Sequence, residues 1–217
     1  MKDYNITLRQ RKHFQTKIAI LKAILAKLKK NNLEDISVKE LCKEAQISEG
    51  TFFNYFPKKT DVLKFYVQLW SIEVSMHAKK IQKEKGSLAA INGIFYYSFD
   101  EKINDAPILF EIIRYTIQLR KKIPIKDLST SEKSIAFPSI EDIEQYKSND
   151  LDATVVPFLQ QALKDGELPK DIDLNTLGLS IRSIFFGVPL ALGLENVEMT
   201  KAIYQKNLES LWHTLNC

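Results

Sequence analysis

The chain has 217 residues, of which 45% are hydrophobic and only 7 each are glycine and proline, a composition typical of a compact and mostly helical protein. No apolar run approaches the ~20 residues of a transmembrane helix and no signal-peptide core is seen at the N-terminus, so we expect a cytoplasmic protein with no membrane partner. The two cysteines, Cys42 and Cys217, lack metal-binding spacing, exclude a disulfide framework and fit a reducing compartment.

The formal net charge of +4 is divided unevenly along the chain. Residues 1–65 carry +7, and the remaining residues carry −3. A basic end on a slightly acidic body is the charge pattern of proteins that bind nucleic acid through one end. Because any single lysine is more often simply solvated, the charge pattern supports this interpretation without deciding it.

The first predicted element is an amphipathic helix that follows a basic arm. We expect residues 1–13 to form the arm, which ends in Arg9, Arg11 and Lys12. Lysines and asparagines at 29–32 indicate the C-terminus of the helix. Between these limits, apolar residues recur at steps of three and four, at Phe14, Ile18, Leu21, Leu25 and Leu28.

Residues 37–63 predict two short helices joined by a tight turn. Ser37 and Glu40 have the spacing of a capping box, so a helix is expected directly after Ser37. A three-residue turn follows, and Ser48 is a good N-cap for a second helix over residues 49–55. This arrangement is typical of a helix-turn-helix, whose second helix enters the DNA major groove. An ordinary helical hairpin inside an all-helical core is the alternative.

The composition of the second helix favours the first interpretation. Gly50, Thr51 and Asn54 share its exposed side, and none of them favours a helix. Small and hydrogen-bonding residues are expected there if this side lies close to a polar partner. Phe52 and Phe56 are expected to anchor the opposite side of the helix in the core.

The remainder of the chain predicts further helices around a core. They are expected at about 58–85, 88–99, 108–119, 150–164, 174–192 and 204–215. Residues 121–149 read as a polar loop with one short helix over 139–146. The segment 174–192 is apolar almost all round, with Pro189 expected to kink or end the helix, and such a helix must be buried on every side. A second copy of the chain would cover it, and burial inside one large monomer is the alternative.

Motifs for catalysis are missing from the sequence. His13, His77 and His213 lie far apart without metal-ligand spacing, and neither a phosphate loop nor a nucleophile motif is found. We therefore expect no catalytic residue, no metal and no cofactor, and we predict that the chain is not an enzyme.

The run GTFFNYFPKKTDVL resembles the signature of the TetR family of bacterial transcription regulators. That signature, Gly-Thr-aliphatic-Tyr-x-Tyr-Phe-x-x-Lys-x-x-Leu, is matched at Gly50, Thr51, Tyr55, Phe56, Lys59 and Leu63. Phe53 stands where the family usually has tyrosine, and without a hydroxyl it is left with an apolar contact, for example to a thymine methyl group. The resemblance implies an all-α protein with a three-helix helix-turn-helix DNA-binding domain, residues 1–57, and a larger helical effector-binding and dimerisation domain, residues 58–217.

The resemblance also implies roles for individual residues. Gly50 would let the helix approach DNA, Thr51 and Tyr55 would bind phosphates, Lys59 would pair with a phosphate, and Asn54 would face the bases or the backbone. The full set of expected DNA-contacting residues is Ser37, Lys39, Ser48, Glu49, Gly50, Thr51, Phe53, Asn54, Tyr55, Lys58 and Lys59.

By the same resemblance, the chain is a repressor that binds a pseudo-palindromic operator as a homodimer and is released by a small apolar effector. The expected effector-binding residues are Tyr66, Trp70, Phe95, Tyr96, Phe99, Phe110, Ile113, Phe158 and Phe185, although core filling is the simpler interpretation of each one alone. The expected dimer contacts are Leu177, Ile181, Phe185, Tyr204, Leu208, Leu211 and Trp212. Two alternatives remain open: a regulator controlled by a protein partner or by no ligand, and a helical enzyme or scaffold whose hairpin is structural.

Overall fold

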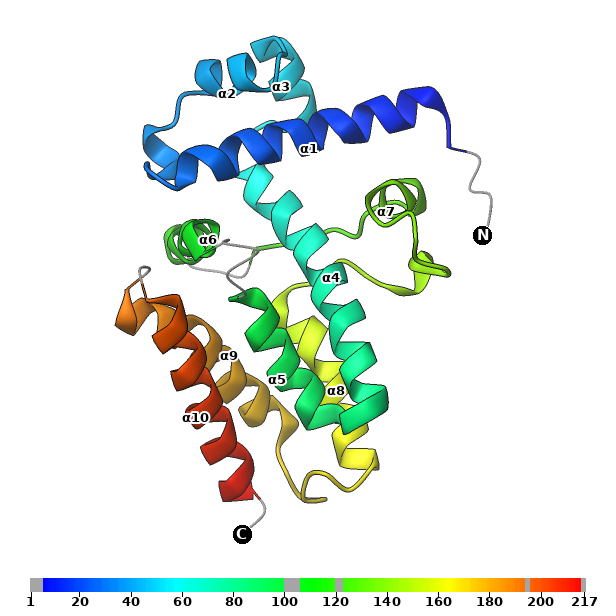
Figure 1. Ribbon diagram of the computed structural model, residues 1–217, viewed down its shortest axis with the longest axis vertical. Helices are drawn as coiled ribbons and strands as arrows, with labels where there is room; N and C mark the ends of the chain where they lie inside the picture. Colours follow the sequence, from blue (N-terminus) through cyan, green and yellow to red (C-terminus); the bar gives the residue numbers. More distant parts are fainter. Residues whose placement is uncertain (1–5, 100–105, 120–122, 194–195, 216–217) are drawn as a thin grey trace. The chain divides into compact units, whose positions relative to one another are not determined.

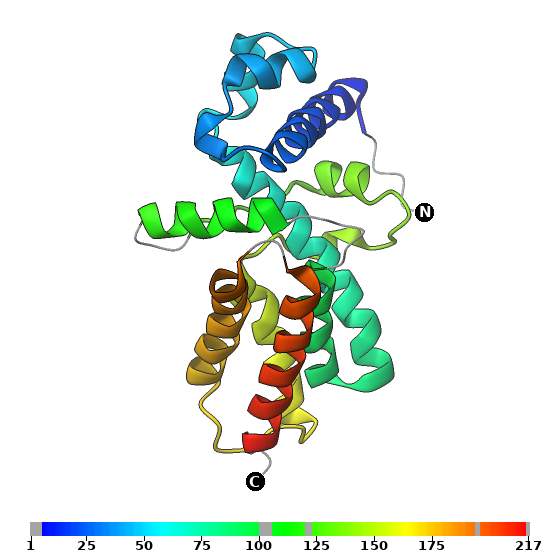
Figure 2. The same cartoon turned by 60° about the vertical axis from the view of Figure 1, so that its left-hand side comes forward.

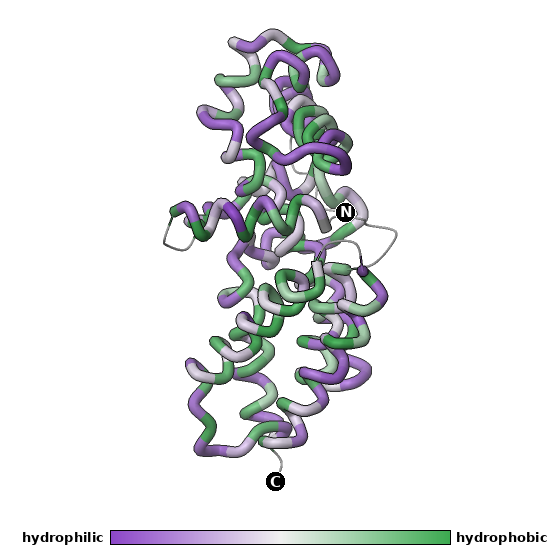
Figure 3. Tube along the Cα trace, turned by 90° about the vertical axis from the view of Figure 1, so that its left-hand side faces the viewer, coloured by the Kyte–Doolittle hydropathy of each residue, from purple (hydrophilic) through white to green (hydrophobic). Residues whose placement is uncertain are grey.

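The fold is all-helical, as the sequence predicts. The computed structural model describes residues 6–99, 106–119, 123–193 and 196–215, and within these ranges the regular elements are α-helices and two short 3₁₀ helices (Figure 1). They are α1 (Leu8–Leu28), η1 (Leu33–Asp35), α2 (Val38–Glu44), α3 (Glu49–Tyr55), α4 (Asp61–Lys85), α5 (Ser87–Ser98), α6 (Ala106–Leu119), α7 (Thr130–Ala136), η2 (Ile143–Gln145), α8 (Leu151–Lys164), α9 (Leu174–Leu192) and α10 (Val197–Leu215). Hydrophobic and hydrophilic residues are interspersed along most of these helices, as in amphipathic helices that pack on a core (Figure 3).

The chain divides into two compact units, each built from two stretches of sequence. The N-terminal unit comprises Met1–Trp70 and Pro107–Ser148, and the C-terminal unit comprises Ser71–Ala106 and Asn149–Cys217. Helix α4 contributes its first turns to one unit and its remaining turns to the other. Residues 107–148 therefore fold together with the helix-turn-helix, a grouping that no sequence pattern indicated.

Helix α1 begins earlier than expected, so the prediction of a basic arm through residue 13 was wrong. Thr7 accepts a hydrogen bond from the backbone N–H of Gln10, and the Gln10 side chain accepts one from the backbone N–H of Thr7. This capping box starts the helix at Leu8. The basic residues 9, 11 and 12 consequently lie on the first turns of a helix, exposed to solvent.

Aromatic side chains join α1, α3 and α4 inside the N-terminal unit. Phe14 of α1 and Phe56 at the end of α3 each lie 5.8 Å from Phe65 of α4, measured between ring centroids. Phe52 is fully buried beside Phe56. These contacts confirm that Phe52 and Phe56 anchor α3 from its inner side. Cys42 of α2 is buried in the same unit.

Helices α5, α8, α9 and α10 pack together in the C-terminal unit, where α9 and α10 run side by side (Figures 1 and 2). The ring of Phe95 meets those of Phe185 and Tyr204 edge to face, with centroids 5.1 and 4.9 Å apart. The Tyr204 hydroxyl donates a hydrogen bond to the Phe185 carbonyl at 2.6 Å. Burial raises the pKa of Tyr204 far above its ordinary value, so this hydroxyl remains a donor at any physiological pH.

A glycine with positive φ marks the break between α4 and α5. Gly86 has φ +90°, and a Cβ there would lie 3.0 Å from the Glu167 carboxylate. That carboxylate accepts hydrogen bonds from the backbone N–H groups of Ser87 and Leu88 at 2.7 and 3.0 Å. A negative charge at a helix N-terminus is favourable, so Glu167 fixes the start of α5.

The region 121–149 holds more structure than expected. Its helix is α7, at Thr130–Ala136, and only the three-residue η2 falls within the predicted helix over 139–146. Ser129 and Glu132 form a capping box at the start of α7. The prediction missed this helix because its seven residues are too few to show an apolar period, so the capping spacing of Ser129 and Glu132 was the only signal.

Helix α9 spans the predicted residues 174–192. Pro189 lies inside the helix, which continues to Leu192 and is therefore not ended there. Within one chain the helix is not buried on every side, because Leu179 and Leu190 are 52% and 57% exposed. By length and composition alone, α9 is the one described helix that could cross a membrane. A single helix of this kind is weak evidence for a membrane, since core and interface helices have the same composition.

Candidate nucleic-acid interface

Two side-chain caps and one left-handed residue set the geometry of α2 and α3. Ser37 and Glu40 form the predicted capping box at the start of α2. Gln46 takes a left-handed conformation with φ 55° in the turn. Ser48 then accepts a hydrogen bond from the backbone N–H of Thr51 at 3.1 Å and starts α3 at the predicted residue. The two helices are therefore a helix-turn-helix in geometry as well as in sequence.

The outer side of α3 is polar apart from one aromatic ring. Glu49, Gly50 and Asn54 are exposed. Phe53 is 47% exposed, and its ring packs edge-on against the buried Phe52 at a centroid distance of 5.4 Å. One side of the Phe53 ring therefore packs on Phe52, and the other side is exposed to solvent.

Among the residues that the structure describes, none requires a glycine at position 50. A Cβ built there would meet only the Ser48 hydroxyl, at 3.9 Å, and the backbone is not left-handed. Gly50 is the second residue of α3, and glycine in a helix costs up to about 0.5–1 kcal/mol relative to alanine. The absence of a side chain at position 50 leaves room for a close approach to α3 from outside.

Helix α1 also reaches this surface, which the sequence did not predict. The rings of His13 and Tyr55 lie 4.5 Å apart between centroids, so the start of α1 runs beside α3. Burial and the nearby Lys17 charge lower the pKa of His13, while Glu132 opposes the shift. The capping box at Thr7 was the sequence signal that could have placed these basic turns on a helix.

The Lys59 ammonium group is bound within the chain itself. Its ammonium group donates hydrogen bonds to the backbone carbonyls of Glu34 and Ile36 at 3.1 and 2.7 Å. Burial lowers the pKa of Lys59, and carboxylates that include Glu111 counteract this shift. The side chain of the neighbouring Lys58 is exposed. In this structure Lys59 satisfies the carbonyl end of η1, and Lys58 is the lysine that faces solvent.

The eleven predicted DNA-contacting residues share a short part of the chain, from the N-cap of α2 to the approach to α4. Three of them, Thr51, Tyr55 and Lys59, are half-buried. The other eight are exposed, namely Ser37, Lys39, Ser48, Glu49, Gly50, Phe53, Asn54 and Lys58. Their exposure is what a contact surface requires, although exposure alone does not identify the partner.

The predicted effector-binding residues are divided between the two units. Four belong to the N-terminal unit, namely Tyr66, Trp70, Phe110 and Ile113. Five belong to the C-terminal unit, namely Phe95, Tyr96, Phe99, Phe158 and Phe185. Of these five, all except Tyr96 are buried, and rings of this group meet around Tyr204. Within the C-terminal unit these side chains fill the core.

The predicted dimer contacts lie mostly inside the C-terminal unit. Only Leu211 is half-buried, while the other six are buried, namely Leu177, Ile181, Phe185, Tyr204, Leu208 and Trp212. The Trp212 indole donates a hydrogen bond to the Asn92 side chain at 3.0 Å. The large apolar side chains of α9 and α10 that face outward are Leu179, Leu190 and Met199.

Within the part of the chain that the structure describes, no three His, Cys, Asp or Glu side chains are grouped so as to hold a metal ion.

Residues 20–64 match the sequence model of the bacterial regulatory proteins of the tetR family. This segment is a TetR-family domain. It contains α2, α3 and residues 20–28 of α1, so the match covers the helix-turn-helix. A search of curated proteins gave no match.

Solved structures support a shared fold for the chain as a whole. Thermus thermophilus FadR, a TetR-family transcriptional repressor solved in complex with lauroyl-CoA, has a TM-score of 0.59 at 17% identity, covering 89% of this chain and 91% of that one. A candidate transcriptional regulator from Pseudomonas aeruginosa PAO1 has a TM-score of 0.57 at 17% identity, covering 92% and 91%. A candidate TetR-family regulator from Shewanella sp. PV-4 has a TM-score of 0.52 at 13% identity, covering 92% and 97%. At these identities the likeness concerns the fold alone.

Proposed function

We propose that the chain is a cytoplasmic repressor that binds a pseudo-palindromic DNA operator as a homodimer and is released by a small apolar effector. The observation that carries the DNA-binding part is the outer side of α3, where Gly50 has no role in the chain's own packing and Asn54 is exposed. A glycine maintained at a cost in stability is explained by a DNA duplex closing onto that side of the helix.

Within this proposal, each exposed group of α3 has a chemical role. The Asn54 amide can bond two atoms of an adenine edge in the major groove. The exposed Phe53 ring suits the methyl group of a thymine. Thr51 and Tyr55 carry hydroxyls for phosphate oxygens, and Lys58 takes the phosphate role first assigned to Lys59, whose ammonium already donates to two carbonyls.

The outward side of α9 supports the homodimer. Only 28% of this apolar helix is buried within the chain, and its Leu179 and Leu190 side chains are more than half exposed. Contact with a second copy would remove this apolar surface from water. Two-fold symmetry would then present two α3 helices to half-sites ~34–36 Å apart, one turn of DNA.

The effector is the least constrained part of the proposal. The rings around Tyr204 contact one another directly, so an apolar ligand placed among them requires a state in which they have separated. FadR, which shares the fold, was solved with lauroyl-CoA, a ligand with a long apolar chain. An effector that binds the released state ~100-fold better contributes about 2.7 kcal/mol toward release from DNA.

The experiment that tests the proposal is selection of bound duplexes from a random pool at moderate salt, followed by titration. We expect a pseudo-palindromic site to emerge. Asn54→Ala should weaken binding to the selected site more than to random DNA. Lys58→Ala should weaken both and reduce the slope of log affinity against log salt by about 1. Failure of the wild-type protein to retain any duplex would refute the proposal.

A further inference from the structure

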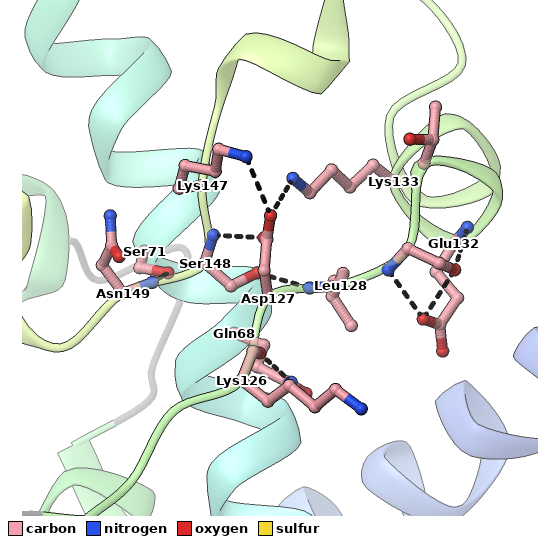
Figure 4. A network of polar contacts seen from close by, with 12 residues as sticks. Gln68, Ser71, Lys126, Asp127, Leu128, Glu132, Lys133, Lys147, Ser148 and Asn149 are labelled. Carbon is pink, nitrogen blue, oxygen red and sulfur yellow. Dashed lines mark hydrogen bonds and ion pairs between the residues drawn. The ribbon is translucent and has the colours of Figure 1, made fainter.

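Residues 123–148, here called the brace, form an anchored segment in the N-terminal unit. The Asp127 carboxylate accepts hydrogen bonds from the Lys133 ammonium group at 2.8 Å and from the backbone N–H of Ser148 at 2.7 Å, so the two ends of the brace meet (Figure 4). Gln68 of α4 donates a hydrogen bond to a backbone carbonyl of the brace (Figure 4). The brace is therefore closed on itself and attached to α4.

The ion pair between Asp127 and Lys133, here called the root of the brace, is charged on both sides at neutral pH. The Lys133 side chain is 3% exposed, and a buried ammonium group requires a charged partner. Burial by itself would raise the pKa of Asp127, but the hydrogen bonds from Lys133 and Ser148 and the charge of Lys147 lower it below its ordinary value. Asp127 is thus ionised and holds the brace closed.

The brace also reaches α1 through α7. Glu132 accepts a hydrogen bond from the Lys17 ammonium group at 2.8 Å, and the two side chains are only 21% and 14% exposed. The same carboxylate accepts the backbone N–H of Ser129, which caps α7. The Lys17 ammonium group lies 4.3 Å from the centroid of the Phe65 ring of α4, a cation–π contact. Lys17 is therefore held between the brace and α4.

This contact bears on the DNA-facing surface. Lys17 lies one helical turn after His13, whose ring contacts Tyr55 of α3. Residues one turn apart share one side of a helix, so a hold on Lys17 sets which side of α1 faces α3. The exposed residues Arg9 and Arg11 lie on the preceding turns of α1.

We propose that Glu132 is a positioning residue for DNA binding, which acts through Lys17 to hold the basic first turns of α1 beside α3. This inference rests on the proposed function, because it gives α1 a part in the DNA contact. A positioning role and a simple charge effect predict opposite changes in DNA affinity when the Glu132 charge is removed. Removal of a negative charge near a basic surface strengthens the general attraction for DNA, whereas loss of a positioning contact weakens binding.

The decisive variant is Glu132→Gln. Glutamine at this position of a capping box still accepts the Ser129 N–H, so α7 keeps its start while the charged contact with Lys17 is lost. We expect about fivefold weaker binding to a duplex at fixed salt, at the lower end of the coupling between linked sites in proteins. Lys17→Met should have a similar effect, the double variant should be no weaker than either single variant, and Lys17→Arg should retain binding.

A matched control is Lys147→Met. Lys147 is 66% exposed and lies 3.7 Å from Asp127, so it belongs to the brace without reaching α1. Its loss should change the affinity less than about twofold, as for exposed ion pairs in general. All variants are compared at a temperature where circular dichroism shows them fully folded, which separates affinity from stability.

Hydrogen exchange of the DNA-free protein provides a second measurement. Glu132→Gln should accelerate exchange of the α1 amides over residues 8–14 and leave those of α9 unchanged. Unchanged exchange in α1, or unchanged or tighter DNA binding by Glu132→Gln, would overturn the positioning role. If the wild-type protein binds no DNA, the proposed function fails, while the exchange experiment still decides whether Glu132 holds α1.

Discussion

The two units differ in what joins their distant segments. In the N-terminal unit, charged groups add long-range connections to those of the rings: Lys17 pairs with Glu132, and Lys59 binds the carbonyls before α2. In the C-terminal unit, buried rings make the connections between α5, α9 and α10, and among the described residues the Glu167 carboxylate binds only backbone N–H groups at the start of α5. The C-terminal unit has an ion pair between Arg182 and Asp152, but both partners are partly exposed.

This difference has a physical consequence for each unit. Contacts between charges depend on protonation and on salt, whereas contacts between buried rings depend on shape and volume. Acid should therefore loosen the unit that carries the DNA-facing helix before it loosens the ring-filled unit. Each unit also holds one tryptophan, Trp70 or Trp212, so single-tryptophan variants can report on the two units separately.

The largest expected effect is the loss of a ring from the C-terminal core. Phe95→Ala removes a fully buried side chain that touches two other rings, and should lower the free energy of unfolding by about 3–5 kcal/mol. Urea titration followed by Trp212 fluorescence in a Trp70→Phe background measures this. An equal shift of the Trp70 signal in the complementary background would mean that the units unfold as one, and the comparison would break down.

A smaller loss is expected when the root of the brace is broken. Asp127→Asn keeps an acceptor for the Ser148 N–H but leaves the buried Lys133 ammonium group without its charged partner. We expect about 2 kcal/mol of destabilisation, below the ~3–5 kcal/mol of a fully buried pair, since Asp127 itself is one-third exposed. The matched control, Asp152→Asn, breaks a partly exposed pair and should cost less than ~1 kcal/mol.

Acid should affect the N-terminal unit more than the C-terminal unit. The folded-state pKa values of Asp127 and Glu132 are lowered, so their contribution to stability is complete above the unfolded carboxyl pKa values and is lost as the pH falls through the folded ones. The urea midpoint seen by Trp70 should therefore fall more between pH 7 and 3 than the midpoint seen by Trp212. Asp173 also has a lowered pKa, but it is an exposed cap, so it should contribute little. Equal acid sensitivity in both signals would contradict the comparison.

The smallest expected effect on stability has the opposite sign. Gly50→Ala should raise the free energy of unfolding by about 0.5–1 kcal/mol, because alanine favours the helix and a Cβ has open space around it. The same change should weaken DNA binding, since the added methyl group stands where the duplex approaches. A variant that gains stability and binds DNA as the wild type does would show that this side of α3 is not closely approached.

Local signals predicted the helix-turn-helix well. Ser37, Glu40 and Ser48 marked the starts of α2 and α3, and each side chain makes the cap that its spacing predicts. Such caps act over three or four residues, so sequence alone is sufficient to read them. The same rule would have placed the start of α1 from Thr7 and Gln10, had the basic residues not suggested an arm.

Long-range choices were beyond the sequence. Lys59 matches a phosphate-binding position, yet an ammonium group suits a backbone carbonyl equally well, and only the fold decides between them. Helix α9 is apolar almost all round, so its pattern could not tell the buried Ile181 from the exposed Leu179. The grouping of residues 107–148 with the helix-turn-helix depends on contacts such as Lys17 with Glu132, more than a hundred residues apart.

The rate at which the buried thiol of Cys42 reacts reports how often the helix-turn-helix opens. Burial, together with the nearby Glu49 carboxylate, raises the pKa of this thiol, so it is protected twice over, by inaccessibility and by the scarcity of its reactive thiolate. Alkylation of Cys42 then requires α2 to separate from its neighbours, and the rate of labelling measures how often that happens. A partner that holds α2 and α3 in place should slow the alkylation of Cys42.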